Sequence, residues 1–260
     1  MNMSKVDDLK AQANGQLRNK VALIVGGDSG LGRAVAIAFA KEEADVALVY
    51  YLAREEALHT KQIVEEEGHS CLLIVGDVEE EKFCQQAVQQ VIDQFGKIDI
   101  LVNNATVRHP QESHENISTE ELERTLHGNL CPMFYMTNAT LPYLNEGSTI
   151  INTTSVTAYK GNEQLLDYSS NRGAIVTFTR SLSQSLEDKG IRVNGVVPGS
   201  VWTMLVSSNF PANKVKALGE QMPTRGASEP AEIAQSIVFL ASDDVSYRAG
   251  QVLFTQSSLT

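Results

Sequence analysis

Short apolar runs alternate with longer amphipathic segments from about residue 19 to residue 254. Each apolar run is typical of a buried strand, and each longer segment repeats apolar residues at helical spacing. Strands are predicted at 21–25, 45–50, 70–76, 98–103, 148–153, 191–197 and 251–254. Helices are predicted at 33–40, 54–67, 79–95, 119–144, 165–189 and 230–241. This alternation predicts an α/β fold, with a single doubly wound parallel sheet and helices on both faces.

Two segments break the alternation. Residues 1–18 are polar and lack periodicity, so we expect an N-terminal arm on the surface or on a sister subunit, ahead of a single domain at 19–260. Residues 198–225 mix Trp202, Met204 and Phe210 with proline and glycine. A long irregular segment in a compact domain is usually functional, so these side chains form either a substrate lid or the packing of a long loop.

Composition narrows the class of protein. A chain of 260 residues, 42% of them hydrophobic, can bury one large core, and a formal charge of −11 without a basic run argues against a nucleic acid partner. Cys71, Cys84 and Cys131 stand in apolar segments without CxxC spacing, which indicates buried thiols in a reducing compartment. His109 and His114 stand in a polar loop and are interpreted as solvated, so no metal site is predicted. With no apolar span and no hydrophobic signal core, we expect a cytoplasmic protein without a membrane partner.

The first candidate site is the turn after the first predicted strand. The chain leaves that strand through Gly26, Gly27, Gly30 and Gly32 and enters an alanine-rich helix. Glycines let the backbone turn sharply and approach a ligand, and the free N–H groups and dipole of a helix N-terminus attract an anion. The pattern indicates a phosphate cradle, with an ordinary strand-to-helix turn as the alternative.

The second candidate site combines Ser155, Tyr168 and Arg172. Tyr168 stands four residues before Arg172 in a predicted helix, so the two side chains share one helix face. The phenol and the cation can therefore meet around one ligand. A surface phenol on a helix is the alternative interpretation of Tyr168.

Together these motifs resemble the short-chain dehydrogenase/reductase family, in its bacterial branch with an N-terminal arm. Gly26, Gly30 and Gly32 have the spacing of the family's cofactor motif, and Ser155 precedes Tyr168 by the family's interval of 168 − 155 = 13 residues. The resemblance covers about residues 19–254. It implies a Rossmann-type fold and an NAD(P)-dependent oxidoreductase whose small-molecule substrate is a carbonyl compound or an alcohol, partly apolar if the long loop is a lid.

The family's catalytic roles carry over to matching positions of this chain. The resemblance implies Tyr168 as general acid or base, Ser155 as the hydroxyl that orients the substrate oxygen, and Asn129 as the group that holds a water chain. Arg172 stands at the position of the family's lysine. The resemblance also implies a homo-oligomer, a tetramer built on the helices at 119–144 and 165–189.

A larger set of residues is implied to bind the cofactor. These are Gly26, Asp28, Ser29, Gly30, Leu31, Gly32, Tyr50, Asp77, Val78, Asn104, Ala105, Thr106, Pro198, Gly199, Val201 and Thr203. Tyr50 ends the second strand, where a carboxylate would bond the adenosine 2′-hydroxyl and repel a 2′-phosphate, so NADP is favoured and NAD is the alternative. Arg33 and Arg54 are near enough in sequence to reach a 2′-phosphate, or are solvated at helix ends.

Four departures from the family's pattern lie around the expected cofactor site. Arg172 replaces a lysine, Val25 a threonine and Thr106 a glycine, and residues 255–260 lack the usual glycine pair. A guanidinium about 5 Å from the phenol still stabilises negative charge there by roughly 3 kcal/mol at an effective dielectric constant near 20, but it cannot release a proton. Val25 removes a hydroxyl that would brace the glycine loop, and Thr106 adds bulk beside the cofactor ribose. The departures motivate a second hypothesis, a protein that binds cofactor or ligand without hydride transfer, as a scaffold or as an isomerase or cyclase.

Overall fold

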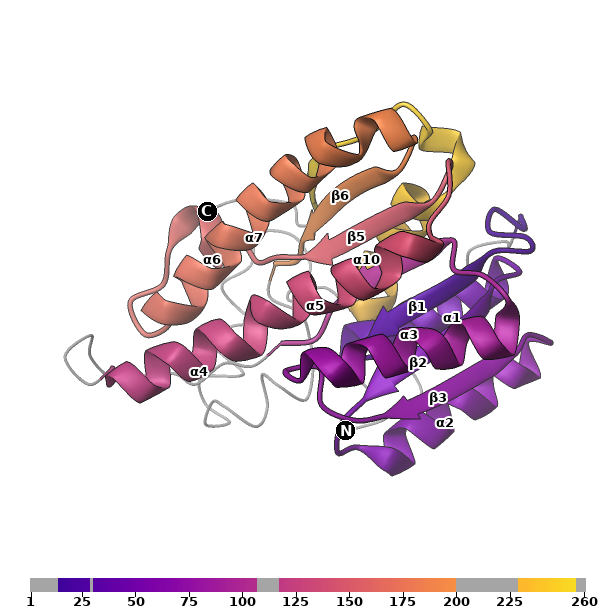
Figure 1. The fold of residues 1–260 in the computed structure, drawn as a ribbon, viewed down its shortest axis with the longest axis horizontal. Coiled ribbons are helices and arrows are strands. Elements are labelled where there is room, and N and C mark those ends of the chain that lie inside the picture. The colour runs from indigo at the N-terminus through magenta and orange to yellow at the C-terminus, as the bar shows by residue number, and fades with distance from the viewer. Residues whose placement is uncertain (1–13, 29, 107–116, 200–228, 256–260) are drawn as a thin grey trace.

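A seven-stranded parallel sheet forms the centre of the molecule (Figure 1). The computed structural model describes residues 14–28, 30–106, 117–199 and 229–255. The strands are β1 (Val21–Val25), β2 (Asp45–Tyr50), β3 (Cys71–Val75), β4 (Ile100–Asn103), β5 (Thr149–Thr153), β6 (Arg192–Val197) and β7 (Val252–Phe254). Their order is β3-β2-β1-β4-β5-β6-β7, and every neighbouring pair is parallel. The predicted doubly wound sheet is therefore confirmed.

Helices cover both faces of this sheet. They are α1 (Gly30–Lys41), α2 (Arg54–Glu66), α3 (Glu81–Phe95), α4 (Thr119–Asn129), α5 (Cys131–Thr140), α6 (Thr157–Lys160), α7 (Leu166–Leu186) and α10 (Pro230–Ala241). Successive strand residues point to opposite faces, so Ile24 packs with α1 and α10 while Leu23 packs with α3 and α5 (Figure 1). Because both faces are covered, all five residues of β1 are buried, which explains the continuous apolar runs in the sequence. In the described part of the chain, no helix combines the length and the apolar character needed to cross a membrane.

The helix predicted at 119–144 is two helices, α4 and α5, which are separated at Leu130. Pro132 stands in the first turn of α5 and has no N–H, so it cannot donate to the carbonyl of Gly128 one turn earlier. α4 starts at a capping box formed by Ser118 and Glu121. The interruption leaves Asn129, whose side chain is buried, as the last residue of α4.

The end of the predicted N-terminal arm belongs to the folded domain. Leu17 is fully buried in the core beneath α1, and the N–H groups of Asn14 and Gln16 donate to Glu42 Oε2 at 3.1 and 3.0 Å. The domain thus begins before residue 19, because one apolar side chain within the polar segment finds a place in the core. Residues 1–13 of the arm lie outside the described residues.

Two of the three cysteines are buried, as the sequence predicts. Cys71 and Cys84 are buried, Cys131 is half-buried, and all three are free thiols. Burial raises the pKa of Cys71 and of Cys84 to about 12. Neither thiol therefore forms the reactive thiolate near neutral pH.

Candidate active site

The predicted site residues follow the carboxyl ends of the central strands. Gly26 follows β1, Asn104 follows β4, and Pro198 follows β6, while Ser155 stands two residues beyond β5. Because β1, β4, β5 and β6 are parallel neighbours, all four positions lie at the same edge of the sheet. This is the edge at which doubly wound sheets bind ligands.

Two glycine positions at the turn from β1 into α1 do not accept a side chain. Gly26 has a φ of 79°, and a Cβ on Gly32 would lie 1.8 Å from the carbonyl oxygen of Gly26. α1 begins at Gly30, and its first turn, which includes Leu31 and Gly32, has no acidic residue. The N-terminal N–H groups and the dipole of this helix therefore attract an anion without a competing carboxylate in that turn. These features fit the pyrophosphate of a dinucleotide. Ser29 lies outside the described residues.

Side chains after β4 and in β5 brace this loop. Asn104 Nδ2 donates to the carbonyl of Gly26 at 3.2 Å, and Thr153 Oγ1 donates to Asn104 Oδ1 at 3.3 Å. The backbone of Ala105 lies so close that a Cβ on Gly26 would be 3.1 Å from it. Val25 is buried in the core, so the loop is held to the next strand without a hydroxyl at that position.

Arg33 and Arg54, the two arginines near the expected ribose site at the end of β2, differ in exposure and in their contacts. Tyr50 is mostly buried there. Arg33 is buried, donates to Thr60 Oγ1 at 3.0 Å and pairs with Glu56, so it ties α1 to α2. Arg54 is exposed at the first residue of α2. Arg33 is thus engaged within the fold, and Arg54 is the accessible cation of the two.

Asp77 and Val78, both predicted to bind the cofactor, follow β3 in a tight turn. Asp77 Oδ1 accepts from the N–H of Glu79 at 2.9 Å, and the carbonyl of Val78 accepts from the thiol of Cys84 at 3.3 Å. These bonds fix the turn between β3 and α3.

Arg172 lies at the centre of the cluster of predicted catalytic residues. Its guanidinium is buried, with Nη1 donating to the carbonyl of Thr153 at 2.8 Å and Nη2 donating to Asn129 Oδ1 at 3.0 Å and to Thr106 Oγ1. The Thr106 hydroxyl donates in turn to Asn129 Oδ1 at 3.1 Å. Arg172 Cζ lies 4.8 Å from the centroid of the Tyr168 ring. The structure therefore brings together Tyr168, Arg172 and Asn129, three of the four predicted catalytic residues.

The fourth predicted catalytic residue, Ser155, stands between β5 and α6. Its half-buried hydroxyl accepts from the N–H of Thr157 at 3.3 Å and from Thr157 Oγ1 at 3.1 Å. The neighbouring Thr154 Oγ1 donates to the carbonyl of Arg172 at 2.8 Å, so this segment is tied to α7.

Two contacts around the cluster were not foreseen. Thr106 was predicted to bind the cofactor and to add bulk beside the ribose, and its hydroxyl bonds both Arg172 and Asn129. Asp167 was not singled out, although it is buried, accepts from Thr125 Oγ1 at 2.6 Å and joins α7 to α4. The available signal was a carboxylate directly before the candidate tyrosine in an otherwise uncharged helix turn.

The segment after β6 is described only at its start. The carbonyl of Pro198 accepts from the N–H of Val156 at 3.2 Å, which joins it to the Ser155 segment, and Gly199 follows it. Val201 and Thr203, predicted to bind cofactor, lie outside the described residues, as do the candidate lid residues Trp202, Met204 and Phe210.

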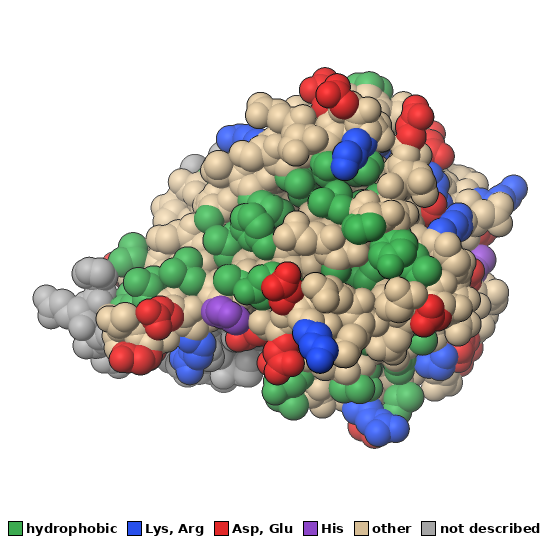
Figure 2. Space-filling view, viewed as in Figure 1, with side chains coloured by type: hydrophobic (Ala, Val, Ile, Leu, Met, Phe, Trp, Pro, Cys, Tyr) green, Lys and Arg blue, Asp and Glu red, His purple; other side chains and the backbone are tan. Residues whose placement is uncertain are grey.

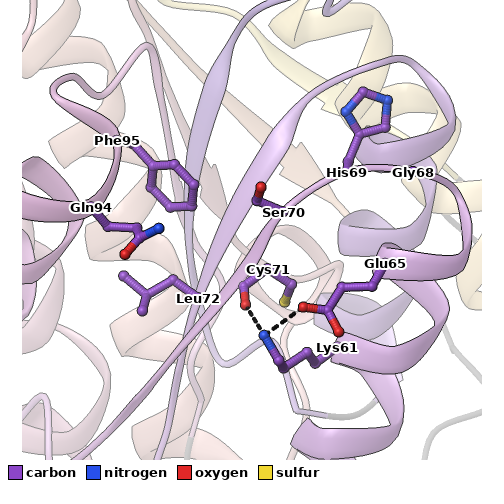
Figure 3. A pocket seen from close by; sticks show the side chains of 9 residues that line it. All are labelled: Lys61, Glu65, Gly68, His69, Ser70, Cys71, Leu72, Gln94 and Phe95. Carbon is purple, nitrogen blue, oxygen red and sulfur yellow. Dashed lines mark hydrogen bonds and ion pairs between the residues drawn. The ribbon is translucent and has the colours of Figure 1, made fainter.

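A separate pocket of about 470 Å³ lies at the other end of the sheet (Figure 3). α2 and α3 flank it, and Cys71 at the start of β3 forms part of its lining. Lys61 Nζ reaches across, donating to the carbonyl of Cys71 at 2.6 Å and pairing with Glu65 at 2.7 Å (Figure 3). Because it lies at the amino end of β3, this pocket is not part of the candidate active site.

Comparisons with known proteins agree with the fold. A family model described as enoyl-(acyl carrier protein) reductase matches residues 25–257. The chain is 54% identical to the uncharacterized oxidoreductase YhdF of Bacillus subtilis, over 95% of this chain and 86% of that protein. It is 45% identical to the chloroplastic NADPH-dependent aldehyde reductase 1 of Arabidopsis thaliana, over 93% of this chain and 86% of that protein. The crystal structure of a short-chain dehydrogenase from Burkholderia cenocepacia in complex with NADP superposes with a TM-score of 0.87 at 27% identity, over 94% of this chain and 99% of that one. The chain belongs to the short-chain dehydrogenase/reductase family and is an oxidoreductase of that family.

Proposed function

We propose that this oxidoreductase interconverts a carbonyl compound and an alcohol with a nicotinamide cofactor, and that Tyr168 exchanges the proton with the substrate oxygen. The observation that carries the proposal is the buried guanidinium of Arg172, 4.8 Å from the centroid of the Tyr168 ring. At this distance and an effective dielectric constant near 20, a positive charge stabilises a phenolate by roughly 3 kcal/mol. That stabilisation suits a phenol that alternately gains and loses a proton.

Each residue of the cluster has a separate task. A bound nicotinamide supplies or accepts the hydride. Ser155 orients the substrate oxygen, Tyr168 holds or receives its proton, and Arg172 keeps a positive charge beside the phenol. An arginine retains its protons at neutral pH, so the proton that replenishes Tyr168 comes from another group. Asn129 keeps the guanidinium in place through its Oδ1.

We further propose NADP as the preferred cofactor, with NAD as the alternative. Tyr50 at the tip of β2 offers no carboxylate against a 2′-phosphate, and the exposed Arg54 is close by in the chain. The similar dehydrogenase from Burkholderia cenocepacia holds NADP, and the Arabidopsis relative is NADPH-dependent. Both support the same preference in this chain.

Replacing Tyr168 by Phe tests the catalytic assignment. Loss of the hydroxyl is expected to lower kcat at least about a hundredfold, because the proton donor is gone, and to change the Kd for NADPH less than about threefold. NADPH fluorescence titration gives the Kd, and aldehyde-dependent loss of absorbance at 340 nm gives kcat. Tyr143→Phe is the matched control, since that hydroxyl bonds Gln89 at 3.2 Å at the surface and is expected to leave both values unchanged. Undiminished turnover in the Tyr168 variant would show that another group supplies the proton.

A second candidate function is binding of cofactor or ligand without hydride transfer. The observation that favours it is Arg172 itself, which cannot pass on a proton as a lysine can. Tight NADPH binding without carbonyl-dependent oxidation over a panel of aldehydes, ketones and sugars would support this alternative. A large gain in rate on Arg172→Lys would show that the native arginine limits hydride transfer.

We also propose that the chain works as a homo-oligomer, a tetramer, in the cytoplasm. Apolar side chains lie open on the face formed by α4, α5 and α7 (Figure 2). In these helices, Leu122 and Leu126 of α4, Phe134 of α5 and Leu166 of α7 are each 39–45% exposed. A group of apolar side chains of this kind is typical of a protein interface. The free thiols support a reducing compartment.

A further inference from the structure

Two of the chain's departures from the family's pattern contact each other. Thr106 follows β4 and Arg172 stands in α7, 66 positions apart, yet Arg172 Nη2 donates to Thr106 Oγ1. Thr106 also donates to Asn129 Oδ1 at 3.1 Å, and that oxygen accepts from Arg172 at 3.0 Å. The three side chains form a closed triangle of hydrogen bonds. A glycine at 106 could form neither of the two bonds made by this hydroxyl.

We propose that Thr106 is a positioning residue, whose hydroxyl, itself oriented by Asn129, holds the guanidinium of Arg172 beside the Tyr168 ring. Thr106 and Arg172 then act as one unit, in which the threonine hydroxyl supplies an acceptor for one donor of the guanidinium. This inference rests on the proposed role of Tyr168.

The need for such an anchor follows from the length and burial of the arginine. Arg172 is 1% exposed, so its donors cannot turn to water. Its acceptors come from three places: Thr153 at the end of β5, Asn129 at the end of α4, and Thr106 after β4. A planar guanidinium held at three points by separate elements cannot rotate. Arg172 Nε has no hydrogen-bond partner among the described residues. Without the Thr106 acceptor, the guanidinium would keep only the bond from Nη1 to the carbonyl of Thr153 and the bond from Nη2 to Asn129 Oδ1.

A purely steric role for Thr106 predicts different results. If Thr106 only fills space, valine, which has almost the same shape, replaces it without loss. If the hydroxyl positions Arg172, serine preserves function and valine does not. Thr140 is the control for loss of a hydroxyl elsewhere in the fold: it is fully buried, whereas Thr106 is exposed, and its hydroxyl bonds only the carbonyl of Met136 in its own helix, at 2.7 Å.

Steady-state kinetics with NADPH and an aldehyde distinguish the steric role of Thr106 from the positioning role. Thr106→Val is expected to lower kcat about tenfold to a hundredfold, since misplacing a group at the reacting centre has effects of this size, while Thr106→Ser stays within about threefold of the parent. The Kd for NADPH and the melting temperature of the two variants are expected to agree with each other. Thr140→Val is expected to leave kcat unchanged. Equal kcat in the valine and serine variants would overturn the proposal.

Arginine NMR tests the anchor without any need for turnover. In protein labelled with [15N]arginine, the Nη protons of Arg172, assigned by their loss in Arg172→Lys, should appear as separate signals because rotation of the group is hindered. Thr106→Val is expected to merge or broaden these signals, and Thr106→Ser to preserve them. Unchanged signals in the valine variant would overturn the anchor. If the parent protein shows no carbonyl reduction, the proposed function fails, and the spectra still decide whether Thr106 fixes the guanidinium.

Discussion

A methyl group on Gly32 would collide with the carbonyl oxygen of Gly26, at 1.8 Å. Gly32→Ala must therefore push α1 away from the loop, and we expect at least about tenfold weaker NADPH binding with a loss of about 1–3 kcal/mol in unfolding free energy. Fluorescence titration and urea unfolding measure the two effects. Gly173→Ala is the control, because Gly173 in α7 has open space around its Cα and should gain about 0.5–1 kcal/mol of helix stability. Similar behaviour of both variants would mean that the loop tolerates a side chain.

Residue spacing along the chain predicted some of these contacts and missed others. Gly26 and Gly32 stand in one turn, and Tyr168 and Arg172 in one helix, so local periodicity was enough to place each pair. The bond from Arg172 to Thr106 joins residues on different elements, and no local pattern encodes it. Thr106 was therefore interpreted as a cofactor contact and by its bulk, and its bond with Arg172 became visible only in the folded chain.

At the scale of elements, Arg33 of α1 bonds both α2 and the glycine loop. Arg33 donates to Thr60 Oγ1, pairs with Glu56, and donates to the carbonyl of Asp28 at 3.1 Å. Arg33→Met is expected to cost about 2 kcal/mol of unfolding free energy, because the partly buried carbonyl of Asp28 and the carboxylate of Glu56 lose a charged donor, and to weaken NADPH binding. Urea unfolding and fluorescence titration measure both.

The control for Arg33→Met is a second arginine–glutamate ion pair, Arg18 with Glu43, near the N-terminal end of the fold. Arg18 lies 2.6 Å from Glu43, but its side chain is 64% exposed, so water and salt screen the pair. Arg18→Met is expected to leave stability and NADPH binding unchanged. If Arg18→Met lowered the unfolding free energy as much as Arg33→Met, burial would not explain the contribution of Arg33 to stability.

Element boundaries show where sequence periodicity stops being informative. The strands followed from apolar runs, because a sheet covered on both faces buries every residue of its central strands. The helix predicted at 119–144 was interrupted, since the apolar period continues through Leu130 while Pro132 removes a backbone donor. Proline was the signal, and its consequence is that Asn129 ends a helix beside Arg172.

At the scale of the whole molecule, net charge and surface pattern act in opposite directions. A formal charge of −11 makes copies of the chain repel one another. The face formed by α4, α5 and α7 nevertheless exposes apolar side chains (Figure 2). Phe134 of α5 is 45% exposed, and its ring is tilted by 50° against the ring of Phe178 in α7, with centroids 4.5 Å apart. Burial of this face in an oligomer would remove apolar surface from water and offset the repulsion. It would also hold α4 and α7, which carry Asn129 and Arg172.

Phe134→Lys tests this assembly. A charged side chain at this exposed position of α5 is expected to dissociate the oligomer, because an unpaired charge would be buried in the interface. Light scattering should then give a mass near 28.4 kDa for the variant and about four times that for the parent. Leu58→Lys on α2, where the leucine is 40% exposed, should keep the parent mass, since that helix lies away from the apolar face. A parent of monomer mass, or a Phe134 variant that still assembles, would rule out this face as the interface. The variant could also dissociate and lose turnover while its melting temperature stays unchanged. That result would show that contacts between subunits keep α4 and α7 in place, and with them Asn129 and Arg172.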